Sequence, residues 1–166
     1  DISVSGMVPA SASLPELARV VGSVFQNPRT QFFHTDTTGE LAFQLENQNM
    51  PREQMRRRLD QVVTELGLES LMERSIFALS GGEKQQIACG SVYASMPQVV
   101  VLDEPSSNLD LESIRKLRGL LETMKASGVT ILVSEHRLWY LHGLADRYLL
   151  LESGKLRGDL TPEQMT

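Results

Sequence analysis

The chain has 166 residues, of which 41% are hydrophobic and 22% are charged, and its formal net charge is −5. This length and composition fit one globular domain with a core of its own, and they exclude a disordered or low-complexity chain. The negative charge argues against a dedicated nucleic-acid-binding protein, because binding a phosphate backbone requires clustered cations. The one basic run, Arg56–Arg58, lies inside a helical pattern and is expected to form a solvated face.

Two further features bound the class of protein. Cys89 is the only cysteine in the sequence, so a disulfide framework is excluded and a reducing compartment is expected. Cys89 itself is predicted to be a small buried residue on a helix. No apolar run approaches the roughly 20 residues that a membrane-spanning helix needs.

The first fifty residues predict two strands and one short helix. Residues 1–6 alternate apolar and polar side chains, as a short strand does. The run from Ser13 to Glu16 has the pattern of a capping box that begins a short helix. A buried strand follows and ends at the turn of residues 27–28, and residues 29–50 are expected to be irregular or weakly helical. The apolar residues of that strand are Val20, Val21, Val24 and Phe25.

The rest of the chain alternates helices with strands. Helices are predicted at residues 51–67, 83–95 and 111–127, with a short one at 137–145. Strands are predicted at residues 98–105, 129–136 and 146–156, and the first two are continuous apolar runs typical of strands buried on both faces. The alternation predicts an α/β fold with a parallel sheet covered by helices. The expected apolar faces of the two longest helices are Met55, Leu59, Val62, Val63 and Leu66, and Ile114, Leu117, Leu120, Leu121 and Met124.

The sequence LSGGE, from Leu79 to Glu83, places a serine and two glycines directly before a predicted helix. Unpaired backbone N–H groups and a partial positive charge at a helix N-terminus favour an anion, and Gly81 and Gly82 let it approach closely. An ordinary helix that is capped by Ser80 and preceded by a glycine turn would have the same residues. The stretch alone does not decide between the two.

Polar side chains follow three predicted strands. Asp103 and Glu104 end one apolar run, His136 lies just past another, and Gln26 closes the first buried strand. Ligands of open parallel sheets bind at the carboxyl ends of the strands. An acid there can hold Mg²⁺, and its neighbour can orient or deprotonate a water. A histidine or an amide at the same edge can contact a phosphate.

The order of these pieces resembles the ATP-binding subunits of ABC transporters. Gln26 resembles the Q-loop glutamine, and LSGGE resembles the family signature with Glu83 where glutamine is commoner. VVVLDEP resembles the Walker B strand, Ser106–Asp110 the D-loop, and His136 the switch histidine. The stretches FQNPRTQFF, SIFALSGGEKQQIA and SEHR are similar to the ATPases of energy-coupling-factor importers, which take up vitamins or metal ions such as cobalt and nickel.

The resemblance implies a P-loop NTPase-type core with an α-helical subdomain, ATP and Mg²⁺ as ligands, and a position on the inner face of the cell membrane. Residues 1–27 and 97–166 would form part of the core, and residues 28–96 the helical subdomain with the signature. The implied partners are a second ATPase domain, paired head to tail, and a transmembrane transporter subunit, with no nucleic acid. The implied catalytic residues are Glu104 and His136. The implied metal ligands are Asp103 and Gln26, and the implied nucleotide-binding residues are Gln26, Ser80, Gly81, Gly82, Glu83, Ser107 and Asp110.

One element of the family is missing from the sequence. The Walker A loop G-x-x-x-x-G-K-[ST] cradles the phosphates, but the only Gly-Lys pair, Gly154-Lys155, is followed by Leu156. We therefore expect the chain to be the C-terminal two-thirds of an ATPase domain that binds ATP poorly and does not turn it over alone. The missing strand would lie next to the strand that ends near His136, so we expect the chain to close that gap or to borrow a strand, for instance in a homodimer.

Two alternatives stay open at this stage. A chromosome-maintenance or DNA-repair ATPase also carries an LSGG signature, although a long coiled coil commonly separates its halves. A naturally truncated regulatory or interaction module would need no catalysis. The retained Glu104 and His136 argue against the second alternative.

Overall fold

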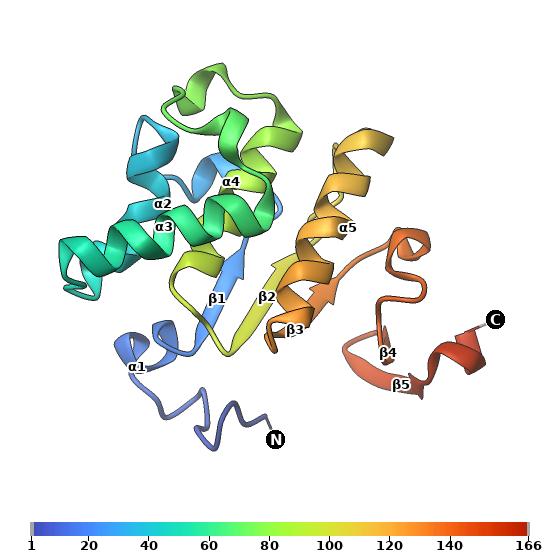
Figure 1. Ribbon diagram of the computed structural model, residues 1–166. Helices are drawn as coiled ribbons and strands as arrows, with labels where there is room; N and C mark the ends of the chain where they lie inside the picture. The colour runs from blue at the N-terminus through green and yellow to red at the C-terminus, as the bar shows by residue number, and fades with distance from the viewer. Residues whose placement is uncertain (1, 166) are drawn as a thin grey trace. The chain divides into compact units, whose positions relative to one another are not determined.

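A computed structural model describes residues 2–165 (Figure 1). The chain divides into two compact units, Asp1–His136 and Arg137–Thr166. The first unit holds a three-stranded sheet and the five α-helices, and the second holds a two-stranded sheet. Among the described residues, no helix is both long enough and apolar enough to cross a membrane.

The sheet of the first unit is parallel, as predicted. Its strands are β1 (Val21–Val24), β2 (Val99–Asp103) and β3 (Thr130–Ser134), in the order β1-β2-β3. Both neighbours of β2 run parallel to it, and they place the carboxyl ends of all three strands at one edge (Figure 1). The parallel α/β core expected from the sequence is thus confirmed.

Burial on both faces was predicted for β2 and β3. In β2, Val100 and Leu102 on one face are buried, but Val99 and Val101 on the other face are only half-buried. In β3 the prediction is wrong, because Leu132 is 52% exposed. The reason is topological: β2 lies between two strands, and β3 is an edge strand of the described sheet. The expected closing of the gap beside β3 does not occur within the first unit.

Helix α4 (Gly81–Ala94) is the centre of a helical cluster beside the sheet. Helices α2 (Thr37–Asn47) and α3 (Arg52–Leu66) pack against it near β1, and α5 (Leu111–Ala126) runs alongside β2 and β3 (Figure 1). All five residues predicted for the apolar face of α5 are buried. Of those predicted for α3, Val62 and Leu66 are buried.

The N-terminal segment differs from the prediction. Residues 1–6 were expected to form a strand, but the described part makes only an isolated bridge between Val4 and Met7, around a turn whose Gly6 has φ +78°. Helix α1 (Leu14–Ala18) begins where the capping pattern predicted, with the Glu16 carboxylate accepting hydrogen bonds from the Ser13 backbone and hydroxyl. Phe25, expected in a buried strand, is 49% exposed because β1 ends at Val24.

Residues 29–50 were predicted to be irregular or weakly helical, and they contain the eleven-residue helix α2. Its N-cap is Asp36, whose carboxylate accepts a hydrogen bond from the Gly39 N–H at 2.8 Å. Leu41 and Leu45 are buried on it, so the helix is stabilised by packing on α4 rather than by propensity.

The second unit contains a hairpin. The predicted helix at residues 137–145 is a short 3₁₀ segment, Leu138–Leu141. Strand β4 (Tyr148–Glu152) was predicted, and it pairs antiparallel with β5 (Lys155–Leu160), which was not. Ser153 and Gly154, both with positive φ, form the two-residue turn between them.

Candidate functional site

The site forms where β1, β2 and β3 end. The backbone N–H of Glu104, directly after β2, donates to the carbonyl oxygen of Ser134 at the end of β3, at 2.8 Å. Glu104 has φ +41°, a sparsely populated backbone conformation for a residue with a side chain. The Asp103 side chain is exposed beside it.

Three of the predicted residues meet at the Glu104 carboxylate. Gln26 Nε2 donates to Glu104 Oε2 at 2.9 Å. His136 Nε2 lies 3.3 Å from Glu104 Oε1. Each carboxylate oxygen therefore has a different partner, one from the end of β1 and one from the end of β3.

The donor set fits a magnesium ion that is shared with phosphates and water. The carboxylate of Asp103 and the amide oxygen of Gln26 are the oxygen ligands that Mg²⁺ prefers. Two such ligands are fewer than an all-protein site needs, and no cluster of three His, Cys, Asp or Glu able to hold a metal occurs within residues 2–165. An Mg²⁺ site here would need further oxygens from a bound ligand and from water.

The signature stretch begins helix α4 through a reciprocal cap. The Ser80 hydroxyl accepts from the Glu83 N–H at 3.3 Å, and Glu83 Oε2 accepts from the Ser80 N–H at 2.7 Å. Arg74 donates to the other carboxylate oxygen of Glu83 at 2.8 Å. The Ser80 N–H and then the Arg74 guanidinium lower the pKa of Glu83 to about 2. At neutral pH, Glu83 is thus ionised, and both of its carboxylate oxygens accept hydrogen bonds.

The two glycines of the signature differ in surroundings. A Cβ on Gly81 would meet nothing within 4 Å, so the space beside it is open. A Cβ on Gly82 would lie 2.1 Å from Ser113 Oγ and 2.7 Å from Ser113 Cβ. Gly82 therefore permits the close contact of α4 with α5, and Gly81 is the glycine with room for a ligand.

The residues that resemble a D-loop link the site to α5. The Ser107 N–H donates to the Glu104 carbonyl oxygen at 3.0 Å, and Ser107 Oγ is buried without a hydrogen-bond partner among the described residues. Asp110 caps α5 by accepting from the Ser113 N–H at 2.7 Å. That hydrogen bond is the main cause that lowers the pKa of Asp110.

The sequence reasoning missed Glu135. Its Oε2 accepts from the Ser106 N–H at 3.2 Å, and its Oε1 accepts from the His136 N–H at 2.9 Å. Glu135 directly precedes His136, and Ser134 before it pairs with Asp103 in the sheet, but only the structure shows the two backbone hydrogen bonds that its carboxylate accepts.

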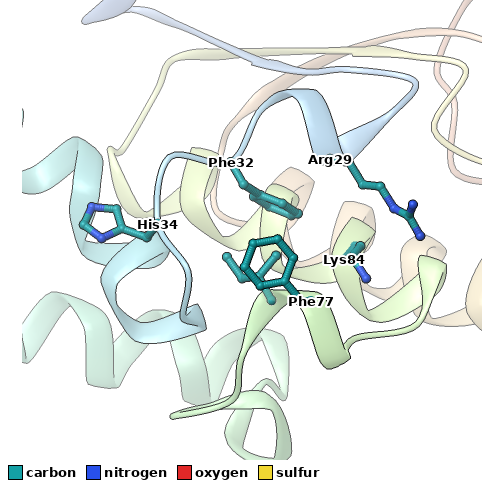
Figure 2. Close-up of a pocket in the computed structure, with 6 residues that line it drawn as sticks. Arg29, Phe32, His34, Phe77 and Lys84 are labelled. Carbon is teal, nitrogen blue, oxygen red and sulfur yellow. The ribbon is translucent and has the colours of Figure 1, made fainter.

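A pocket of about 330 Å³ was also not predicted. In Figure 2 the rings of Phe32 and Phe77 lie at the centre, with His34 on one side and Arg29 and Lys84 on the other. Lys84 is buried and its Nζ donates to the Leu79 carbonyl oxygen. Burial and then the nearby Arg29 lower the pKa of Lys84. The lining, which Ile76 completes, contains two cations and no acid.

The parallel sheet with polar residues at its carboxyl edge is typical of α/β domains that bind nucleotides. The ABC transporter family model matches residues 1–107. An ABC transporter ATP-binding protein of Treponema denticola is 52% identical over 95% of the chain and 32% of its own length. One of Pyrococcus furiosus is 33% identical over 95% of the chain and 60% of its own length.

The solved structure of cbiO1 from Clostridium perfringens, part of the ABC transporter complex cbiONQ, has a similar fold. It matches with a TM-score of 0.84 and 28% identity, over 91% of the chain and 61% of cbiO1. The chain belongs to the ABC transporter ATP-binding family, and it spans about a third of the length of the first curated relatives it matches.

The structure also bears on the chromosome-maintenance alternative, in which a long coiled coil commonly separates the two halves. Helices α2 and α3, of 11 and 15 residues, do not form such a coiled coil.

Proposed function

We propose that this chain is part of an ATPase that couples ATP binding and hydrolysis to the import of a small solute across a membrane. The observation that carries the proposal is the junction at Glu104, where Gln26 and His136 contact the two oxygens of one carboxylate. A positioned carboxylate with an amide and an imidazole suits activation of a water beside a phosphate.

Each residue of the junction has a separate part in this proposal. Glu104 would orient the attacking water and accept its proton, and His136 would hold the γ-phosphate. Asp103 and Gln26 would hold Mg²⁺, which neutralises charge on the phosphates when bound. Gln26 donates to Glu104 through its amide nitrogen, so its amide oxygen would be the atom that serves the metal.

The signature would act on nucleotide held by another domain. Gly81 has open space beside it and Ser80 is exposed at the start of α4, so both are free to face a phosphate. The sequence has no Walker A loop, so we propose that the γ-phosphate at Ser80, Gly81 and Gly82 belongs to a second ATPase domain, paired head to tail. Ser107 and Asp110 would lie at the same interface between the two ATPase domains.

The membrane partner would contact the helical subdomain of residues 28–96. The Arg29 and Lys84 side chains in the pocket suit a segment of a transmembrane subunit that presents an acid together with apolar side chains. The match to cbiO1, part of a transporter complex, supports this partner and an energy-coupling-factor importer. The site of action would be the inner face of the cell membrane.

Phosphate release is the test. We expect the full-length protein to hydrolyse Mg-ATP, and the 166-residue chain alone to release phosphate at background rate. Turnover by the 166-residue chain that equals the full-length rate would contradict the requirement for an upstream phosphate loop. A full-length protein that folds but does not hydrolyse ATP would overturn the enzymatic function and favour an interaction module.

A further inference from the structure

The carboxylate of Glu135 joins two loops of the site. Glu135 follows β3 directly, and its two oxygens accept hydrogen bonds from two separate backbone donors. Oε2 accepts from the Ser106 N–H at 3.2 Å, in the loop after β2. Oε1 accepts from the N–H of His136 at 2.9 Å. A single side chain thus ties the loop that carries Glu104 to the loop that carries His136.

The tie is strong because one of its donors is deeply buried. Ser106 is 0% exposed, and a buried N–H that loses its acceptor destabilises the folded state. A charged acceptor also makes a hydrogen bond stronger than a neutral acceptor does. Removing the carboxylate therefore loosens the loop after β2 and the loop after β3 together.

His136 depends on its backbone for position. Its side chain is 85% exposed, so packing does little to hold the imidazole that lies 3.3 Å from Glu104. On the other loop, the Ser107 N–H donates to the Glu104 carbonyl oxygen. The distance between the imidazole and the Glu104 carboxylate is consequently set by two backbone segments. The hydrogen bond from the Glu104 N–H to the Ser134 carbonyl oxygen joins them at the strand ends, and Glu135 joins them beyond that point.

We propose that Glu135 is a positioning residue, which holds His136 in register with Glu104 by fixing the loop after β3 to Ser106. The proposal rests on the ATP hydrolysis proposed above. Since misplacing a reacting group by about 1 Å can cost about 100-fold in rate, the loss should fall on kcat rather than on ATP binding.

The experiment uses the full-length protein with Glu135→Ala and Glu135→Gln. We expect Glu135→Ala to lower kcat by about 10- to 100-fold, with the KM for ATP changed less than about 2-fold. Glu135→Gln keeps one carbonyl oxygen and should recover part of the rate. Glu53→Gln removes an exposed carboxylate on α3 and is the matched control, with no expected change.

A double variant tests whether Glu135 acts through His136. In the His136→Ala background, the further change to Glu135→Ala should alter kcat less than about 2-fold, because groups that act as one unit are not additive. A full second loss, or a kcat of Glu135→Ala equal to wild type, overturns the proposal.

Hydrogen exchange separates this inference from the proposed function. In Glu135→Ala, peptides that contain Ser106 and His136 should both exchange faster than in wild type, with α3 unchanged. Exchange unchanged in either peptide overturns the tie between the loops. If wild type itself shows no ATP hydrolysis, the proposed function fails, whereas an active wild type with an equally active Glu135→Ala variant refutes only the role of Glu135.

Discussion

Gln26 donates a hydrogen bond to Glu104 at 2.9 Å, although 78 positions separate them in the sequence. The sheet register explains the contact. Val24 of β1 is the partner of Leu102 of β2, and Gln26 and Glu104 each follow two residues later. Parallel strands in register therefore bring the two side chains to the same edge.

Replacing Glu104 by glutamine removes the proposed base but keeps a side chain of the same size and shape at this position. We expect Glu104→Gln in the full-length protein to lower kcat by about 100- to 10,000-fold, as loss of a positioned general base does. Binding of Mg-ATP should persist, because the proposed metal ligands Asp103 and Gln26 are unchanged in this variant. Steady-state phosphate release and equilibrium binding of a labelled nucleotide measure the two effects.

The surface variant Glu53→Gln, which breaks only an exposed pair with Arg57 on α3, should keep the wild-type rate. Equal rates for Glu104→Gln and Glu53→Gln would show that Glu104 is not the base.

The two signature glycines offer a matched pair of variants. Gly82→Ala would place a Cβ 2.7 Å from Ser113 Cβ, whereas Gly81→Ala meets open space. Overpacking of this kind costs about 1–3 kcal/mol, so we expect urea unfolding to show that loss for Gly82→Ala. Gly81→Ala should unfold within about 0.5 kcal/mol of wild type.

A second change tests the cause. Ser113→Gly removes the clashing atoms, so the cost of Gly82→Ala should be smaller in that background than in wild type. A cost that is the same in both backgrounds would mean that the contact with Ser113 is not its source.

The sequence predicted the gathering of Gln26, Glu104 and His136 well, because strand alternation alone requires a parallel sheet with a common carboxyl edge. The sequence did not predict that the Ser113 side chain leaves no room for a Cβ at Gly82. That contact depends on how closely α4 and α5 pack. Glu135 was missed because its role is to accept backbone hydrogen bonds, and no residue spacing identifies such an acceptor.

The missed elements have physical causes as well. Thr37 and Gly39 lower the helix propensity of α2, and burial of Leu41 and Leu45 outweighs it. The exposure of Leu132 could not be predicted from its apolar run, because a strand in mid-sheet and a strand at the edge have the same composition.

Cys89 is predicted to be unreactive in the native protein. Its side chain is 0% exposed, and burial raises the pKa of the thiol to about 12. Since the thiolate is the reactive form, we expect no labelling by iodoacetamide at pH 8 within an hour, and complete labelling in 8 M urea, as followed by mass spectrometry. Labelling of the native chain at the rate seen in urea would show that α4 opens readily.

The salt bridge and cap at Glu83 make the stability of α4 depend on acid. The pKa of Glu83 falls from 4.5 to about 2 on folding, chiefly because the Ser80 N–H and the Arg74 guanidinium stabilise the carboxylate. A folded pKa below the unfolded value means that the stabilisation is fully present above pH 4.5. It is lost as the pH falls from 4.5 towards 2.

Glu83→Gln should flatten this acid dependence. Glutamine can still accept from the Ser80 N–H, but it carries no charge and does not titrate. Because the Glu83 side chain is 28% exposed and so partly screened, we expect wild type to lose about 1–2 kcal/mol more unfolding free energy than the variant between pH 5 and pH 2. Urea unfolding of the 166-residue chain at a series of pH values measures the difference, with Glu53→Gln as the control that should follow wild type. Parallel pH profiles for wild type and Glu83→Gln would show that the cap does not stabilise the charged form of Glu83.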